Sequence, residues 1–316
     1  MGEKYLPRKK MKVKRPRNLP AAWPQLSYGN EARTPILAIE PLAGSWPTFF
    51  LKKDKEGSFL SPNGEPICFE IAQPSNLHFE QELTVVRDAL ENLTPHQEEI
   101  ARYWGEGPAT KQWSPIIDKL IDTYSAPDAP QENPVRAARI LAAVQAGIHD
   151  AFVVTWFFKY LWNIPRPIQL DQSLKPVLVT PKFPAYPSGH AVISGTAEVI
   201  LSYFFPPEAE KLKELAEENA ISRIYAGVHF PSDGEQGLRL GRHIGRMIVT
   251  TLHHQCDSDQ VRIDPPITKF LDADLQPPPY KQAIPFPRNG PSASKQPLPE
   301  NCILLFEDDE SDDEDE

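Results

Sequence analysis

Apolar residues recur at helical spacing along the middle of the chain. The first such stretch holds Phe79, Leu83, Val86 and Leu90, each three or four positions after the last. Because an α-helix turns once every 3.6 residues, these four side chains lie on one face of a helix. The pattern therefore predicts an amphipathic helix that begins near residue 76 and buries this face.

Four longer stretches extend the pattern. Residues 135–163 are rich in alanine, aliphatic and aromatic side chains, and residues 188–205 carry a single charge, Glu198, which is typical of a buried helix. Residues 208–223 suit a charged surface helix. Residues 233–254 carry glycines at four-residue steps, which allow a neighbouring helix to approach closely. The sequence thus predicts an all-α fold, a bundle of helices.

Two local signals mark helix starts. Thr94 suits an N-cap, Pro95 suits the first helical position, and Gln97 completes a capping box. The Asn133-Pro134 pair gives a similar signal before the long stretch. Both signals agree with the helices that the apolar spacing predicts.

Composition divides the chain into three parts. Residues 1–75 are rich in proline and glycine, and we expect them to form an extended arm around the body. Residues 76–263 form the predicted helical domain, which would hold the chemistry. Prolines return in residues 264–316, whose last ten include nine acidic residues, so we expect a disordered tail there. The arm also makes an arm-exchanged homodimer an expected assembly.

Charge limits the kinds of partner. The formal net charge is −10 at pH 7, although the first 17 residues include eight lysines and arginines. A net-acidic body does not attract anions from a distance, so an anionic ligand needs a local cationic pocket. A solubilising arm explains the basic end, and we expect small-molecule substrates rather than nucleic acid.

The sequence also predicts a soluble, cytoplasmic protein without a transmembrane segment. No uninterrupted apolar run approaches the ~20 residues of a membrane-spanning helix, and the basic N-terminal residues lack the apolar region of a secretory signal. Three widely spaced cysteines, Cys68, Cys256 and Cys302, argue against a disulfide framework or a zinc site and fit a reducing compartment.

Three short blocks combine residue types that bind oxyanions. They contain, in chain order, Lys159, Arg166 and Pro167, then Pro187, Ser188, Gly189 and His190, then Ser222, Arg223, His229 and Asp233. Lysine offers a point charge, and arginine a planar fork that grips an oxyanion through two hydrogen bonds. A Ser-Gly pair at a helix start adds backbone N–H groups and the positive end of the helix dipole. An imidazole held by a carboxylate is fixed in one tautomer and suits a nucleophile or a metal ligand.

Each block alone has an ordinary structural explanation, as a helix-end charge, a helix cap or a surface histidine–aspartate pair. Together they resemble the signature of the superfamily that joins vanadium-dependent haloperoxidases to type 2 acid and lipid phosphatases. That signature reads K-x6-R-P, P-S-G-H and S-R-x5-H-x3-D, and all eleven specified positions match in order. The resemblance covers roughly residues 90–250, and residues 150–160 look like a helix of bacterial haloperoxidase-like members.

The resemblance implies the helical fold of this superfamily and a role for each residue of the blocks. Five residues would bind the oxygens of vanadate or phosphate: Lys159, Arg166, Ser188, Gly189 and Arg223. His229 would bond the central atom, vanadium in a haloperoxidase or phosphorus in a phosphatase. Asp233 would orient His229, and His190 would move protons.

The signature does not separate two reactions. A haloperoxidase would carry vanadate as cofactor and oxidise a halide with hydrogen peroxide. A soluble acid phosphatase would instead form a phosphohistidine on His229, while His190 protonates the leaving alcohol of a phosphomonoester. Trp156 and Phe183 resemble the halide pocket of fungal chloroperoxidases and favour the haloperoxidase, although both also suit a packed core. An inactive oxyanion-binding protein is a third alternative.

Overall fold

The computed structural model describes residues 19–29, 31, 33–35, 38–125, 134–275, 277 and 279–283. From the N-terminus its α-helices are α1 (Phe79–Glu91), α2 (Pro95–Gly105), α3 (Trp113–Tyr124), α4 (Pro134–Trp162), α5 (Pro167–Leu170), α6 (Gly189–Phe204), α7 (Ala209–Tyr225) and α8 (Pro231–His253). Single-turn 3₁₀ segments and a short antiparallel strand pair complete it: η1 (Trp23–Gln25), η2 (Ala43–Ser45), β1 (Lys52–Lys53), β2 (Phe59–Leu60), η3 (Pro74–Asn76) and η4 (Pro206–Glu208). The predicted all-α bundle is confirmed.

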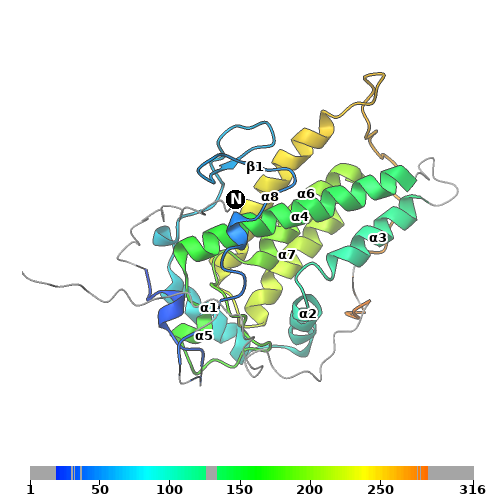
Figure 1. Ribbon diagram of the computed structural model, residues 1–316. Helices are drawn as coiled ribbons and strands as arrows, with labels where there is room; N and C mark the ends of the chain where they lie inside the picture. Colours follow the sequence, from blue (N-terminus) through cyan, green and yellow to red (C-terminus); the bar gives the residue numbers. More distant parts are fainter. Residues whose placement is uncertain are drawn as a thin grey trace, which may run out of the picture.

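Helix α6 lies at the centre of the bundle. Figure 1 shows it gathered side by side with α4, α7 and α8, and it packs against all three. The predicted burial is confirmed, and the lone charge Glu198 accepts hydrogen bonds from Arg242 Nε. Gly241 of α8 allows the close approach, because a Cβ there would lie 2.0 Å from the carbonyl oxygen of Val192. The start of α8 is thereby held beside the start of α6.

Helix α4 corrects one expectation about membranes. The stretch Pro134–Leu170 is long and apolar enough to cross a membrane by length and composition, although the sequence analysis expected no segment of this kind. Isolated polar residues such as Lys159 do not lower the mean hydropathy of so long a stretch enough to exclude it. Half of its most apolar window is buried inside the protein.

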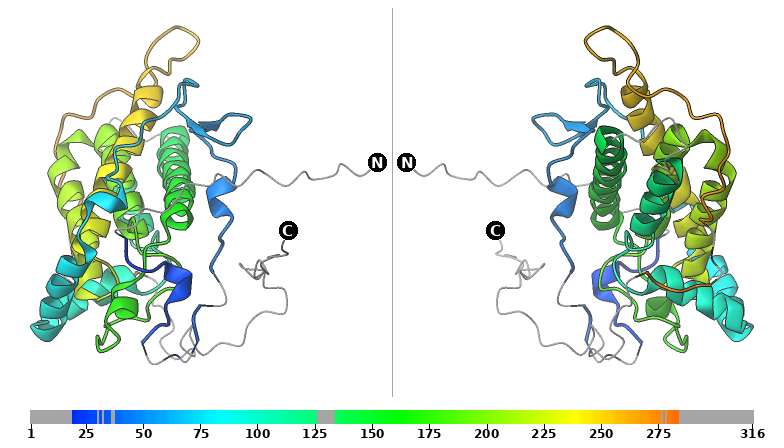
Figure 2. Two further views of the ribbon diagram at one scale, coloured as in Figure 1. Left: turned by 90° about the vertical axis from the view of Figure 1, so that its left-hand side faces the viewer. Right: turned by 90° about the vertical axis from the view of Figure 1, so that its right-hand side faces the viewer.

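The part of the N-terminal arm that the structure describes lies against the body. Trp23 is fully buried, and Leu51 and Phe59 belong to the main core. In both views of Figure 2 the blue segment that contains η2 runs beside α4, in agreement with the contacts between these elements. Asp150 of α4 fixes this segment, since its carboxylate accepts three backbone N–H groups from residues 49–51 at 2.7, 2.8 and 2.9 Å.

Two further features lie outside the helices that apolar spacing predicted. Helix α3, which packs Trp113 into the core, was not predicted. Residues 264–275, which the sequence analysis assigned to the tail, lie against the body with Ala273 and Leu275 buried. The basic residues of the first 17 positions and the acidic end at 307–316 lie outside the described residues.

We expect replacement of Asp150 to loosen the arm. Asp150→Ala leaves three backbone donors without their acceptor, one of them on the buried residue Leu51, and should lower the free energy of unfolding by about 2–4 kcal/mol in urea titrations. Asp150→Asn keeps one carbonyl oxygen and should lose less. Asp118→Ala, an exposed replacement on α3, should stay within about 0.5 kcal/mol of wild type. Equal midpoints for Asp150→Ala and wild type would contradict this role.

Candidate active site

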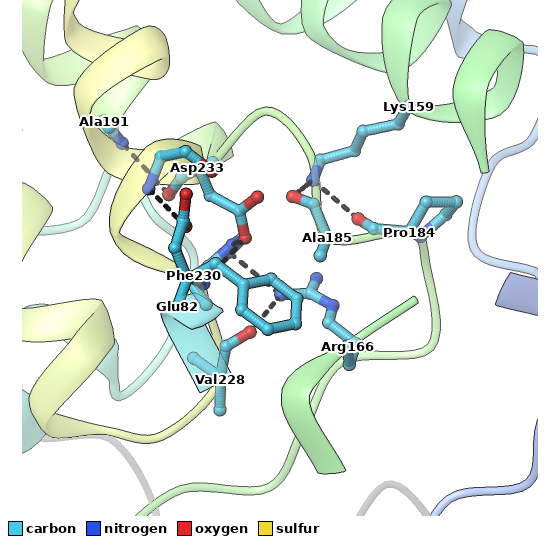
Figure 3. A network of polar contacts seen from close by, with 12 residues as sticks. Glu82, Lys159, Arg166, Pro184, Ala185, Ala191, Val228, Phe230 and Asp233 are labelled. Atoms are coloured by element: carbon cyan, nitrogen blue, oxygen red, sulfur yellow. Dashed lines mark hydrogen bonds and ion pairs between the residues drawn. The ribbon is translucent and has the colours of Figure 1, made fainter. Parts of the chain in front are cut away.

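The three signature blocks meet at one end of the helical bundle. The signature residues occupy helix termini or the adjoining loops: Lys159 near the end of α4, Arg166 at the N-cap of α5, Ser188, Gly189 and His190 at the start of α6, Arg223 in the last turn of α7, and His229 and Asp233 around the start of α8. All of these residues except the half-buried His190 are buried. Figure 3 shows side chains from the first and third blocks converging. The predicted residues are therefore brought together, although their roles stay predictions.

His229 is held in one tautomer. Its Nδ1 lies 2.7 Å from Asp233 Oδ2, and the same oxygen accepts the backbone N–H of Phe230 at 3.0 Å. On the other side, Nε2 lies 2.9 Å from Arg166 Nη1, which is always a donor. The imidazole therefore carries its proton on Nδ1 and presents a lone pair at Nε2. This is the state that a nucleophile or a vanadium ligand requires.

Arg166 and Lys159 are fixed by backbone carbonyl groups. The Arg166 guanidinium donates from Nε to Phe183 O at 2.9 Å and from Nη1 to Val228 O at 2.8 Å. Lys159 Nζ donates to Pro184 O at 2.7 Å and Ala185 O at 2.6 Å (Figure 3). Because neither cation is paired with a carboxylate among the described residues, both charges remain available to an anion.

Arg223 and His190 carry buried polar atoms that lack partners. Among the described residues, nothing accepts a hydrogen bond from Arg223 Nε or Nη1, and His190 Nε2 has no partner. Both side chains line one cavity together with Arg166 and His229. Because buried polar groups are normally hydrogen-bonded, this set of free groups indicates a binding site for a polyvalent oxyanion.

The start of α6 adds backbone groups to the same cavity. The Ser188 hydroxyl caps the helix by accepting the Ala191 N–H at 3.5 Å, and the Ser188 backbone N–H donates to Asp233 O at 2.9 Å. Gly189 lines the cavity, whereas Lys159, Ser188 and Asp233 are buried and are not among the residues that line it. The helix dipole therefore points its positive end at the place where the cations converge.

The cavity has a volume of about 300 Å³ and an aromatic side. Trp156 and Phe183 both line it, with ring centroids 5.0 Å apart. Phe183 also lies beneath two of the cations, since Lys159 Nζ is 5.2 Å and Arg166 Cζ is 4.8 Å from its ring centroid. Both aromatic residues predicted for a halide pocket thus line the same cavity as Arg166 and Arg223, which we call its cationic floor.

Burial and mutual repulsion perturb the charges of the site. Burial, together with the charge of Arg166, lowers the pKa of Arg223 to about 9 and holds the pKa of Lys159 well below its usual value. Burial raises the pKa of Asp233 to about 7, against the effect of the Phe230 N–H and the nearby cations. An anion in the cavity would relieve the repulsion among these cations, so the site is electrostatically prepared to bind one.

Sequence reasoning missed the residues that the arm supplies. Tyr28 donates its hydroxyl to Pro181 O at 2.9 Å and lies beside Arg166, whose charge opposes the burial that raises the Tyr28 pKa to about 12. Ile39 lines the cavity, as does Gly105 at the end of α2. A Cβ on Gly105 would lie 2.6 Å from Arg223 Nη2. Tyr28, Ile39 and Gly105 belong to no repeated sequence pattern. A glycine at the end of a predicted helix, Gly105, is the one signal that could have indicated such a position.

Comparison with known proteins agrees with this geometry. The family model of the PAP2 superfamily matches residues 139–255, which include all three signature blocks. Residues 139–255 thus match the PAP2 superfamily. Comparison with curated proteins gave no significant match.

Three solved structures are similar to this chain to different degrees. A bacterial vanadium-dependent iodoperoxidase is 26% identical, with a TM-score of 0.51, over 68% of this chain and 57% of its own. An apo-type bacterial vanadium-dependent chloroperoxidase is 15% identical, with a TM-score of 0.57, over 74% and 63%. A transmembrane PAP2-type phosphatidylglycerolphosphate phosphatase from Bacillus subtilis is 18% identical, with a TM-score of 0.41, over 55% and 85%. The chain thus spans less than two thirds of the length of either peroxidase.

The cytoplasmic location expected from the sequence is contradicted. Its basis was the lack of a segment able to span a membrane, whereas Pro134–Leu170 has sufficient length and hydropathy. Interruption by single polar residues was therefore an inadequate criterion.

The protonation of His190 predicts a pH dependence of stability. Burial and the charges of Arg223 and Arg166 hold its pKa well below 6.5, the value expected for the unfolded chain. The unfolded chain therefore binds the extra proton below about pH 6.5, and the free energy of unfolding should fall with falling pH by up to ~1.4 kcal/mol per pH unit from this residue. His190→Gln should lose less stability than wild type between about pH 6.5 and 5. The free energy of unfolding is measured by urea titration at each pH. An equal loss in His190→Gln and wild type between pH 6.5 and 5 would argue against a neutral His190 in the folded protein.

Proposed function

We propose that the protein is a vanadate-dependent haloperoxidase that oxidises halide with hydrogen peroxide. The observation that carries this proposal is the aromatic pair Trp156 and Phe183 on the wall of a cavity whose floor is cationic. Such a wall strips water from a halide while the nearby cations balance its charge. The likeness to the bacterial iodoperoxidase, at 26% identity, supports the same choice.

The free groups of the cavity fit vanadate. His229 Nε2 supplies a lone pair for the central atom, and the unpartnered donors of Arg223 suit its oxygens. Arg166, Lys159 and the start of α6, with Ser188 and Gly189, add further positive charge. Bound vanadate would supply the Lewis acid that activates hydrogen peroxide toward a halide.

The chain's own residues would control protons and water around this group. Asp233 keeps the His229 proton on Nδ1 through the 2.7 Å contact, so Nε2 stays unprotonated and its lone pair, which Arg166 Nη1 contacts at 2.9 Å, would be given to the central atom. His190 is neutral in the free protein because burial and the arginines lower its pKa. Its unpartnered Nε2 can therefore accept a proton from incoming hydrogen peroxide and return it later.

A soluble acid phosphatase is the second candidate, and the His229–Asp233 pair favours it equally. In that reaction the Nε2 lone pair attacks phosphorus and the P–O bond to the alcohol breaks. The bound phosphate would offset the charges of Arg223 and Arg166 that lower the His190 pKa, so that His190 can carry a proton and pass it to the leaving oxygen. Water then hydrolyses the phosphohistidine. Phosphate shares the tetrahedral shape and negative charge of vanadate, so the same cationic cavity serves both. A third candidate, an inactive oxyanion-binding protein, would bind vanadate without turnover.

One pair of assays separates these functions. Vanadate-loaded protein with hydrogen peroxide and bromide should brominate a reporter dye, and protein freed of vanadate should not. In the second assay, vanadate-free protein should hydrolyse p-nitrophenyl phosphate at most slowly, and added vanadate should suppress this by occupying the same cavity. Brisk phosphoester hydrolysis without halide oxidation would make the protein a phosphatase. Vanadate binding without either activity would support the inactive alternative.

Replacement of His229 and Asp233 tests whether His229 bonds the central atom of the oxyanion. His229→Ala removes the ligand to the central atom and should reduce turnover by roughly 1000-fold or more. Asp233→Asn can no longer hold the Nδ1 proton as firmly and should weaken vanadate binding by roughly 10- to 100-fold. His253→Ala, an exposed histidine at the end of the same helix, provides the control and should change neither quantity. Undiminished turnover in His229→Ala, with circular dichroism unchanged, would refute the assignment.

A further inference from the structure

The N-terminal arm completes the wall of the cavity at Ile39. Of the described residues that line the cavity, Ile39 alone comes from the arm. The residue is 48% exposed, so it borders both the cavity and the solvent. This position suits a residue that limits which groups can enter.

Hydrogen bonds to α4 and to the loop before Phe183 fix the backbone of Ile39. Its carbonyl oxygen accepts hydrogen bonds from Trp156 Nε1 at 3.1 Å and from Tyr160 Oη at 2.8 Å. Its N–H donates to Lys182 O at 3.1 Å, one residue before Phe183. The arm is therefore attached to both segments that carry the aromatic pair.

Contacts on either side of Ile39 hold the arm in place. Upstream, the Tyr28 hydroxyl donates to Pro181 O, and Glu31 pairs with Lys182 at 2.6 Å. Downstream, residues 49–51 donate to Asp150. Because Ile39 itself and described residues on both sides of it are held by these contacts, Ile39 forms a preorganised part of the wall, which is what selection by size requires.

The remaining wall indicates the kind of group that fits. Phe152, Leu178 and Val179 line the cavity with Trp156 and Phe183, so apolar side chains border the cations Arg166 and Arg223. The cavity of about 300 Å³ must hold the oxyanion as well, which leaves room for an apolar group no larger than about one aromatic ring.

We infer that Ile39 sets the upper size of the apolar group admitted beside the oxyanion, and that the ligand class is a small anion or reactant bearing a single ring. This inference rests on the proposed function only in that an oxyanion occupies the cationic floor. It holds for a haloperoxidase, where the ring belongs to the organic acceptor, and for a phosphatase, where it belongs to the leaving group.

Calorimetric titration of three anions tests the inference without any turnover. The probes are inorganic phosphate, phenylphosphonate and naphthylphosphonate, which share the anionic head and differ in apolar size. They are titrated into the full-length wild type, Ile39→Ala and Ile39→Trp. Leu42→Ala is the matched control, because Leu42 lies three residues further along the arm, is 65% exposed and does not line the cavity.

Inorganic phosphate should bind all four proteins with the same dissociation constant, since Ile39 does not touch the floor. Naphthylphosphonate should bind Ile39→Ala about five- to tenfold more tightly than wild type, because the opening is wider. Phenylphosphonate should bind Ile39→Trp about tenfold more weakly. Leu42→Ala should match wild type for all three anions.

The two possible failures are distinct. If phosphate binds every variant but the preference between phenyl and naphthyl groups does not move with residue 39, the size-setting role of Ile39 is overturned and the proposed function stands. If none of the three anions binds wild type, the oxyanion function itself is overturned, and this inference falls with it. Unchanged phosphate affinity also shows that a variant has kept its fold at the site.

Discussion

Three buried cations lie close to the buried carboxylate of Asp233 at the end of this bundle, and much of the structure follows from that excess of positive charge. Among the described residues, Lys159, Arg166 and Arg223 are almost fully removed from solvent, and Asp233 is fully buried beside them, with the half-buried Glu82 next to it. Such an arrangement is unfavourable unless an anion completes it, because each cation loses its hydration and repels the others. The protein lowers this cost with backbone carbonyl groups around Arg166 and Lys159, which supply dipoles without neutralising charge. The positive charges of Arg166 and Arg223 therefore remain available to an anion in the cavity.

The helical core keeps these groups from moving apart. Gly241 brings α8 so close to α6 that any side chain at this position would meet backbone atoms of α6. The two helix starts are joined by the hydrogen bond from Ser188 N–H to Asp233 O, so the anion-facing end of α6 and the support of His229 form one unit. Precise placement of polar groups in an active site requires this kind of rigid support, because a small displacement weakens every contact to a bound anion.

The sequence allowed the helical bundle and the converging site to be predicted for a physical reason. Signature residues such as Arg223, His229 and Asp233 have fixed spacings because they lie within or beside the same two helices, whose geometry is local. The capping box at Thr94 is likewise a contact between neighbours in sequence. The roles of Tyr28 and Ile39 depend instead on contacts with residues more than a hundred positions away, for which the sequence carries no periodic signal. Membrane-span criteria failed in a related way, since single polar residues do not outweigh the mean hydropathy of α4.

The cationic floor of the cavity and its apolar walls would have different roles: the floor would bind the oxyanion, and the walls would contact the reacting partner. Charge and shape at the floor would suit a tetrahedral oxyanion but would not distinguish vanadate from phosphate, since both would present negatively charged oxygens to Arg223 and an electrophilic central atom, vanadium or phosphorus, to His229. The difference must therefore arise where the reacting partner approaches, and there the structure supplies aromatic and aliphatic side chains in place of the polar groups that would hydrate an alcohol or a water nucleophile. Phe183 belongs to both regions, because its ring lies under Arg166 and against Trp156. It couples the charge of the floor to the apolar wall. A halide in contact with that ring would lie within reach of the same cations that hold the oxyanion.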